Sequence, residues 1–269
     1  KGAAGSLGIH GYMANAGYEE VRQAIAENLN ERFGTKFTAH NLVMTVGAAG
    51  GLNIIFKTIL DPDDEVIVFA PFFGEYRQYA ANFDAKIVIV QPNLETFQPD
   101  LADLEAKITA RTKALIVNTP NNPTGAVFSK EEVSEIARLA KKYDVAILAD
   151  ELYSRQILEK DFTYTHMRSL PEKPDKLITI MGPSKTESLS GFRLGVGYGT
   201  PEIITRMEKL QAVVSLRCAG YNQAAFYRWF SEPEGWMEKR IADHRQIRDD
   251  ILKVINSCPG CWARPTEGG

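Results

Sequence analysis

Short apolar runs alternate with helix-period apolar stripes along most of this 269-residue chain. A helix is predicted over 17–33, because Val21, Ile25 and Leu29 recur there with the helical period. The same pattern predicts helices over 52–60, 75–82 and 129–143. Runs of consecutive apolar residues predict strands at 41–45, 65–70, 86–90, 113–117, 145–149 and 176–181. This alternation predicts an α/β fold, with a mainly parallel sheet covered by helices on both faces.

Sequence signals at helix ends define the bounds of one of these helices and of a further helix near the end of the sequence. Ser129 precedes the helix over 129–143 and Glu132 follows three residues later, which is the spacing of a capping box. After Pro201 the pattern turns helical, and 234–255 is predicted as one long helix that ends at the turn 258–260. Its apolar residues fall on roughly one stripe: Trp236, Ile241, Ile247, Ile251 and Val254.

Composition narrows the class of protein. Apolar residues make up 44% and charged residues 24% of the chain, as in an ordinary globular protein, which excludes a disordered or collagen-like chain. The net charge of −3 provides no basic field for nucleic acid, so we expect no nucleic-acid partner. No apolar run approaches the ~20 residues that span a bilayer, and no signal-peptide core begins the sequence. We therefore expect a cytoplasmic protein without a membrane partner.

The three cysteines are too few for a disulfide framework in a chain of this length. Cys258 and Cys261 have the spacing that redox and zinc sites use, but no second ligand pair stands nearby. We therefore interpret this pair as part of a turn after a helix and expect no metal site.

Candidate chemistry gathers just after the predicted strands. In a parallel sheet, ligands bind beyond the carboxyl ends of the strands, so these residues are expected to share one site. They comprise the small residues Gly47, Ala48 and Ala49, the aromatic pair Phe72 and Phe73, the segment NTPNNPTG at 118–125, Asp150 with Glu151 and Tyr153, and Ser184, Lys185 and Arg193.

That set combines groups with complementary chemistry. A helix N-terminus and an arginine suit a phosphate, an aromatic plane suits stacking, and an acid, an amide and a phenol suit a polar ring. A lysine amine is a nucleophile toward carbonyl groups. An aldehyde cofactor with a phosphate, a phenolic oxygen and a ring nitrogen would use all of these groups, and pyridoxal 5′-phosphate is such a cofactor.

Three motifs in order carry a family resemblance. NTPNNPTG at 118–125, DELY at 150–153 and SKTESLSGFRLG at 184–195 resemble the motif series of class I/II aminotransferases, which are fold-type I pyridoxal-phosphate enzymes of the aspartate aminotransferase superfamily. Each motif alone is a weak signal, but the three in order, each preceded by a predicted strand, are specific. The resemblance extends from Tyr12 through Arg193.

The resemblance implies a role for each matching residue. Lys185 matches the lysine that forms the internal aldimine and later moves a proton between the substrate Cα and the cofactor's C4′. Asp150 matches the carboxylate that pairs with the pyridinium nitrogen, and a neighbouring cation would keep it ionised. Glu151 is its less favoured competitor. Asn122 and Tyr153 match the pair that hydrogen-bonds the phenolic oxygen.

The remaining matches concern the ring and the phosphate. Phe73 aligns with the aromatic residue that stacks on the pyridine ring, although Phe72 could hold that place. The backbone N–H groups of Ala48 and Ala49 and the Arg193 guanidinium fit the phosphate. Tyr12 resembles the tyrosine that reaches the phosphate of a neighbouring subunit, which implies a homodimer with a shared active site.

Two departures from the family pattern stand out. Gly182 occupies the position where many relatives have a phosphate-binding serine, so we expect Ser184 to supply the hydroxyl contact instead. The N-terminal arm and most of the small domain look absent, and with them the arginine that clamps the substrate carboxylate; Arg264 is not a convincing replacement. We expect 1–233 to form the large cofactor domain and 234–269 an interdomain helix with the beginning of a small domain.

The resemblance implies transfer of the amino group of an L-amino acid to a 2-oxo acid. Two alternatives stay open: another reaction of the same cofactor and fold, by a lyase, a decarboxylase or an aminocyclopropane-carboxylate-synthase-like enzyme, or a non-catalytic sensory domain of a regulator. The identity of donor and acceptor cannot be predicted, because the specificity residues lie mostly in segments absent from this sequence.

Overall fold

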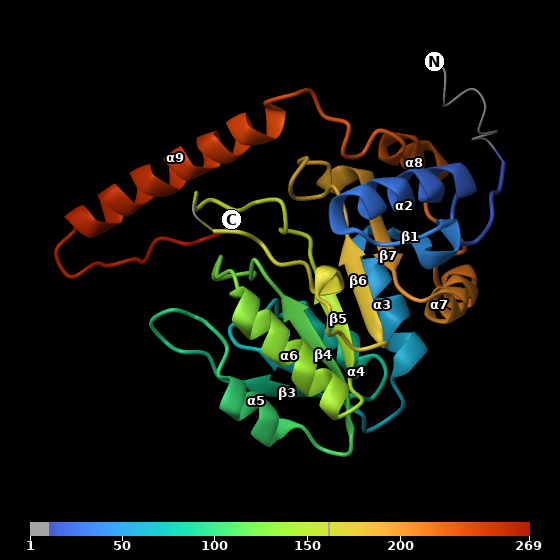
Figure 1. Ribbon diagram of the computed structural model, residues 1–269, viewed down its shortest axis with the longest axis horizontal. Helices are drawn as coiled ribbons and strands as arrows, with labels where there is room; N and C mark the ends of the chain where they lie inside the picture. Colours follow the sequence, from blue (N-terminus) through green and yellow to red (C-terminus); the bar gives the residue numbers. More distant parts are fainter. Residues whose placement is uncertain (1–10, 161) are drawn as a thin grey trace.

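The computed structural model describes residues 11–160 and 162–269 (Figure 1). At its centre lies a seven-stranded sheet with the strand order β1-β7-β6-β5-β4-β2-β3. The strands are β1 (Leu42–Val46), β2 (Glu65–Phe69), β3 (Lys86–Val90), β4 (Thr112–Asn118), β5 (Ala146–Asp150), β6 (Leu177–Met181) and β7 (Leu194–Tyr198).

The sheet is mainly parallel, as the sequence predicts. Strands β3, β2, β4, β5 and β6 pair in parallel, whereas β7 runs antiparallel to both of its neighbours, β6 and β1. Because β7 lies between them, β1 again points the same way as the parallel strands. The carboxyl ends of β1, β4, β5 and β6 therefore face one edge of the sheet.

Helices cover both faces of this sheet (Figure 1). On one face α3 (Gly47–Ile59), α4 (Glu75–Ala81) and α7 (Pro201–Val214) pack against the side chains of Val66, Ile116, Leu148 and Ile180. On the other face lie α2 (Glu19–Phe33), α5 (Leu101–Lys107), α6 (Lys130–Lys142) and α8 (Gly220–Phe226). Alternate strand residues enter opposite cores, which is why the strand sequences are apolar without interruption.

Most predicted elements are confirmed to within a few residues. Helix α6 has the predicted capping box: Glu132 N donates to Ser129 Oγ at 3.2 Å, and Ser129 N donates to Glu132 Oε2 at 2.7 Å. Helix α3 begins at Gly47, five residues before the predicted start, because the glycine- and alanine-rich segment itself is helical. The strand β7 and the helix α5 have no counterpart among the predicted elements.

Helix α9 (Trp236–Ser257) lies along the outside of the molecule (Figure 1). All of its residues are at least partly exposed, and the predicted apolar stripe includes Ile247, Ile251 and Val254 in contact with solvent. Arginines connect the helix to the body: Arg240 Nη2 donates to Ser188 Oγ at 2.7 Å, and Arg245 Nε donates to the Leu158 carbonyl.

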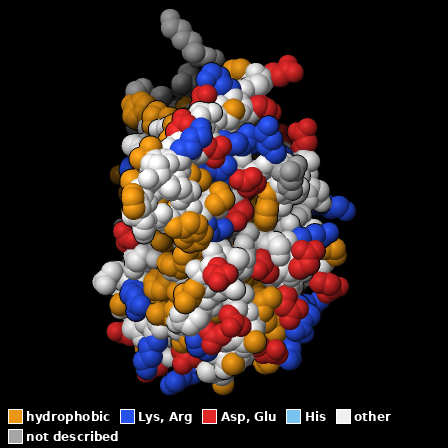
Figure 2. All heavy atoms as spheres, turned by 90° about the vertical axis from the view of Figure 1, so that its left-hand side faces the viewer, with side chains coloured by type: hydrophobic (Ala, Val, Ile, Leu, Met, Phe, Trp, Pro, Cys, Tyr) orange, Lys and Arg blue, Asp and Glu red, His pale blue; other side chains and the backbone are white. Residues whose placement is uncertain are grey.

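Charge is mixed on the molecular surface. On the face shown in Figure 2, acidic and basic side chains are interspersed, in keeping with the small net charge. Among the described residues, no helix is both long enough and apolar enough to cross a membrane. Cys258 and Cys261 are exposed free thiols at the end of α9, and no cluster of metal-ligating side chains occurs within residues 11–160 and 162–269.

Candidate active site

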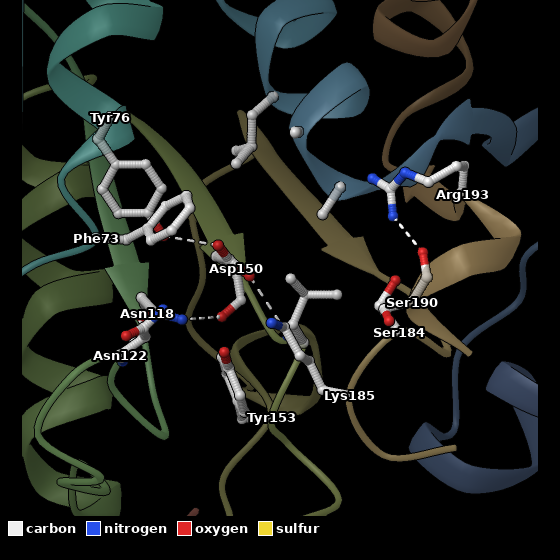
Figure 3. A pocket seen from close by; sticks show the side chains of 14 residues that line it. Phe73, Tyr76, Asn118, Asn122, Asp150, Tyr153, Ser184, Lys185, Ser190 and Arg193 are labelled. Carbon is white, nitrogen blue, oxygen red and sulfur yellow. Dashed lines mark hydrogen bonds between the residues drawn. The ribbon is translucent and has the colours of Figure 1, made fainter. Parts of the chain in front are cut away.

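A pocket opens at the carboxyl ends of the central strands (Figure 3). Residues from the ends of β4 and β5, from the start of α3 and from the loop after β6 converge on it. Its lining comprises Ala48, Ala49, Leu52, Phe73, Tyr76, Asn118, Asn122, Asp150, Leu152, Tyr153, Ser184, Lys185, Ser190 and Arg193. Segments from residue 48 to residue 193 thus meet in one concavity, as the topology of a parallel sheet allows.

Of the residues to which the family resemblance gives a preferred role, all but one line this pocket. The exception is Tyr12, which lies on the surface with 83% of its area exposed. Its ring centroid is 4.7 Å from the Arg217 guanidinium carbon.

Asp150 is the last residue of β5 and is almost completely buried, with 4% of its area exposed. Tyr76 Oη donates to its Oδ2 at 2.6 Å, and Leu152 N donates to its Oδ1 at 3.4 Å. Burial raises the pKa of this carboxyl group to about 6, while the hydrogen bond from Tyr76 opposes the rise. Desolvation thus outweighs the attraction of Lys185. The lowering of this pKa that the sequence predicts concerns the carboxylate paired with a protonated cofactor ring, and it stays a prediction.

Asn118 ties two of the predicted residues together. Its Nδ2 donates to the main-chain carbonyl of Asp150 at 3.1 Å, and its Oδ1 accepts from Asn122 N at 2.8 Å. Since Asn118 ends β4, next to the end of β5, one side chain fixes both the loop that carries Asn122 and the backbone of Asp150.

Lys185 enters the pocket from the loop that follows β6 (Figure 3). Its Nζ lies 5.7 Å from the ring centroid of Tyr153. Ser184 precedes it in the same lining. An amine, a phenol and a hydroxyl therefore border one space, which is the donor set that the motifs predicted.

At the other end of the pocket Arg193 meets the start of α3. Arg193 Nη1 donates to the Ser190 carbonyl at 2.6 Å. A Cβ atom added to Gly47, which has φ +67°, would lie 2.3 Å from Arg193 Nη2, so only glycine permits this approach. A guanidinium beside a helix N-terminus is a favourable place for an anion.

The structure separates the sequence-based candidates from their competitors. Both Phe72 and Phe73 pack against the core, but only Phe73 lines the pocket; the Arg77 guanidinium carbon lies 5.1 Å from the Phe72 ring centroid. Glu151 is buried and lies with Oε2 2.7 Å from Nδ1 of His166. The presence of glycine at position 182, where many relatives have a serine, has a steric reason. A Cβ atom there would lie 2.9 Å from the Leu194 carbonyl oxygen.

Sequence reasoning missed Tyr76 as a pocket residue, and it gave no individual role to Asn118, although the segment 118–125 was expected at the site; Leu52, Leu152 and Ser190 also line the pocket without a predicted role. For Asn118 a signal existed, since it is the first polar residue after the apolar run of its strand. Tyr76 lies three residues after Phe73, one helical turn along. Nothing in the linear sequence indicates that its hydroxyl meets Asp150, 74 positions away.

Comparison with known proteins decides the family. The sequence model of "Aminotransferase class I and II" matches residues 3–262. The chain belongs to this family. Among curated class I and II aminotransferases, the chain is 36% identical over 260 residues to the aspartate/prephenate aminotransferase of Thermus thermophilus, with 95% of this chain covered. It is 32% identical over 260 residues to the aspartate aminotransferase of Pyrococcus horikoshii, with 96% covered.

The fold agrees with that family. The crystal structure of an aspartate aminotransferase from Rhodobacter sphaeroides matches with a TM-score of 0.92 and 40% identity, and the match covers 99% of this chain and 70% of that one. The chain spans 66% of the length of each of the two curated aminotransferases. It corresponds to the large domain of the aspartate aminotransferase fold.

Class I and II aminotransferases use pyridoxal phosphate, and the pocket fits it. A buried carboxylate that one short hydrogen bond holds in place suits a ring nitrogen, and a lysine amine suits an aldehyde. The glycine cradle beside Arg193 leaves backbone N–H groups of α3 for a phosphate. The donor set therefore matches each polar group of the cofactor.

Proposed function

We propose that this protein is a pyridoxal-phosphate-dependent aminotransferase that transfers the amino group of an L-amino acid to a 2-oxo acid. The observation that carries the proposal is the convergence of Lys185, Asp150 and Arg193 on one pocket, with Asp150 at the end of β5 and the other two in the segment between β6 and β7. The named relatives are aminotransferases, which favours transamination over the lyase and sensory alternatives. Their names make aspartate the first amino donor to test.

Different residues of the pocket would bind different parts of the cofactor. Ser184, Arg193 and the N–H groups of Ala48 and Ala49 would hold the phosphate, Phe73 would cover one face of the ring, and Asn122 and Tyr153 would bind the phenolic oxygen. When bound, pyridoxal phosphate supplies an aldehyde for amines and an electron-withdrawing ring. The Asp150 carboxylate would hold the proton on the ring nitrogen. Lys185 Nζ would bind the aldehyde carbon and would afterwards accept and return the proton of the substrate α-carbon.

The test is replacement of Lys185. In the Lys185→Ala variant we expect loss of the absorption band that arises from the bond between the lysine amine and pyridoxal phosphate, and loss of 2-oxoglutarate formation from glutamate. Lys176→Ala is the matched control, because Lys176 stands just before the other end of β6 and its Nζ pairs with Asp144 at 2.6 Å. An unchanged spectrum in Lys185→Ala would refute the assignment of the lysine. If the parent chain binds pyridoxal phosphate but its absorption spectrum does not change on addition of aspartate or glutamate, the result would argue against transamination.

We further propose that the protein is a homodimer with a shared active site. Support comes from an apolar surface around Arg217, whose exposed members are Tyr12, Val213, Val214 and Leu216. Val213 is 83% exposed and Leu94, on a distant loop, is 81% exposed. We expect Val213→Glu to sediment as a monomer and Leu94→Glu to keep the parent mass. A parent chain that is monomeric at tens of micromolar would contradict the proposal.

The domain organisation is a proposal as well. We propose that 1–233 form the large domain and that 234–269 begin a second one, supported by the exposed apolar side chains of α9. In limited proteolysis this division predicts early cleavage between α8 and α9, and first cuts inside the sheet domain would contradict it. A cytoplasmic location stays a prediction, which the free thiols of Cys218, Cys258 and Cys261 favour.

A further inference from the structure

We propose that Tyr76 is a positioning residue for Asp150: its hydroxyl fixes the buried carboxylate and keeps it in the ionised form that a protonated ring nitrogen requires. This inference rests on the proposed function, since the ring nitrogen belongs to the bound cofactor. Figure 3 shows Tyr76 directed toward Asp150 from helix α4, beside Phe73.

The hydrogen bond between Tyr76 and Asp150 is short, and both residues are buried. Tyr76 is 1% exposed and Asp150 is 4% exposed. Tyr76 Oη donates to Oδ2 at 2.6 Å, which is the length of a charge-assisted O–H···O⁻ bond. The main-chain donor to the other oxygen, Leu152 N, is 3.4 Å away and is correspondingly weak. Tyr76 is therefore the stronger donor that the structure gives to this carboxylate.

The electrostatics fix the direction of the effect. Burial raises the pKa of Asp150, the hydrogen bond from Tyr76 lowers it, and among the charged neighbours Glu151 raises it and Lys185 lowers it. The pKa of Tyr76 itself is raised well above 10, by burial first and by Asp150 next, with Tyr153 and Tyr79 adding to the rise. The phenol thus keeps its proton at every pH at which the carboxylate titrates. It is a permanent donor and never a competing base.

The ring of Tyr76 has a second, separable contact. It meets Phe73 edge to face, with 5.5 Å between ring centroids and 79° between ring planes. Phenylalanine at position 76 keeps this packing and removes only the hydroxyl group. The backbone of Asp150 stays held by Asn118, whose Nδ2 donates to the Asp150 carbonyl at 3.1 Å. Tyr76→Phe therefore isolates the bond to the carboxylate.

The experiment compares Tyr76→Phe with the parent chain and with Tyr143→Phe. Tyr143 Oη also donates to a carboxylate, Glu105 Oε1 at 2.9 Å, but on the surface away from the pocket. In the cofactor-free protein, the 13C resonance of the Asp150 carboxyl reports its titration. Loss of a hydrogen bond to a charged group should raise the pKa of Asp150 by about 1 to 2 in Tyr76→Phe. Tyr143→Phe should leave the pKa of Asp150 unchanged.

The loaded protein supplies the second measurement. With 15N in the ring of pyridoxal phosphate, the ring nitrogen should shift toward the unprotonated value in Tyr76→Phe, because a more basic carboxylate competes for the proton. Replacement of Tyr76 by 3,5-difluorotyrosine, a more acidic phenol of nearly the same shape, should lower the pKa of Asp150. This variant decides the question if Tyr76→Phe does not fold.

Each outcome separates the two proposals. An Asp150 titration that is the same in Tyr76→Phe and the parent overturns the role of Tyr76, whether or not the cofactor binds. A shifted titration with an unmoved ring nitrogen also overturns it, since Tyr76 would then not act on the ring. A parent chain that binds no pyridoxal phosphate refutes the proposed function, while the cofactor-free titration still decides the coupling of Tyr76 and Asp150.

Discussion

Substitution of Gly47 by alanine tests the proposed anion site at its tightest point. The residue has φ +67° and opens helix α3, and a Cβ atom there would stand 2.3 Å from Arg193 Nη2. Two effects follow from the one added methyl group. The backbone is strained in the left-handed region, and the guanidinium must leave its place beside the helix N-terminus.

The two effects have different sizes and different readouts. A left-handed conformation costs a non-glycine residue about 1–2 kcal/mol, which should appear in the free energy of unfolding. Displacement of Arg193 removes a hydrogen bond to a charged group, about 1.5–3 kcal/mol. The second loss weakens the binding of pyridoxal phosphate roughly 10- to 150-fold. Pyridoxal, which has no phosphate, should bind Gly47→Ala about as well as it binds the parent chain.

Gly34→Ala is the matched control. Gly34 has φ +63°, but a Cβ atom there meets nothing within 4 Å. The variant should lose a similar stability, measured by urea denaturation, and keep the parent affinity for both ligands in equilibrium dialysis. The reasoning would be refuted if Gly47→Ala bound pyridoxal phosphate as tightly as the parent chain does, or if it lost equal affinity for pyridoxal.

Three further predictions concern stability. The rise in the pKa of Asp150 from 3.8 to about 6 makes its ionised form destabilising by about 3 kcal/mol at neutral pH. The stability gained by Asp150→Asn should therefore grow from about pH 4 to about pH 6 and stay constant above about pH 7. Urea midpoints across this range measure the gain. A gain that does not depend on pH would contradict the raised pKa of Asp150. Ser129→Ala should cost about 1 kcal/mol through loss of the α6 cap, whereas Ser134→Ala within the same helix should cost less; equal losses would exclude the cap as the cause. Gly182→Ser should cost about 1–3 kcal/mol, because its side chain meets the Leu194 carbonyl, with thermal unfolding as the measure. A stable Gly182→Ser variant with improved affinity for pyridoxal phosphate would show that the space exists.

Local sequence was sufficient for most elements and for most of the pocket. A buried strand needs only a short apolar run, and a helix only its apolar period and its cap, so both can be predicted from adjacent residues. Asp150 ends its strand, Asn122 and Lys185 each follow a strand by four residues, and the carboxyl ends of parallel strands meet at one edge. The apolar-run pattern did not predict β7, because its sequence, Leu194–Tyr198, is interrupted by two glycines. These suit a close approach to β1 and α3, where a Cβ atom at Gly195 would lie 2.7 Å from the Gly47 backbone.

Tertiary structure alone determined the hydrogen-bond partners and the pKa shifts of the pocket residues. The pairing of Tyr76 with Asp150 joins residues 74 positions apart, and no local pattern encodes that approach. The raised pKa of Asp150 likewise follows from packing, because removal of water from a carboxylate is a property of everything around it. Sequence determined which chemical groups stand at the strand ends, since strand and turn propensities act over a few residues. The neighbours, burial and charge state of those groups depend on contacts between distant segments, and only the folded chain supplies them.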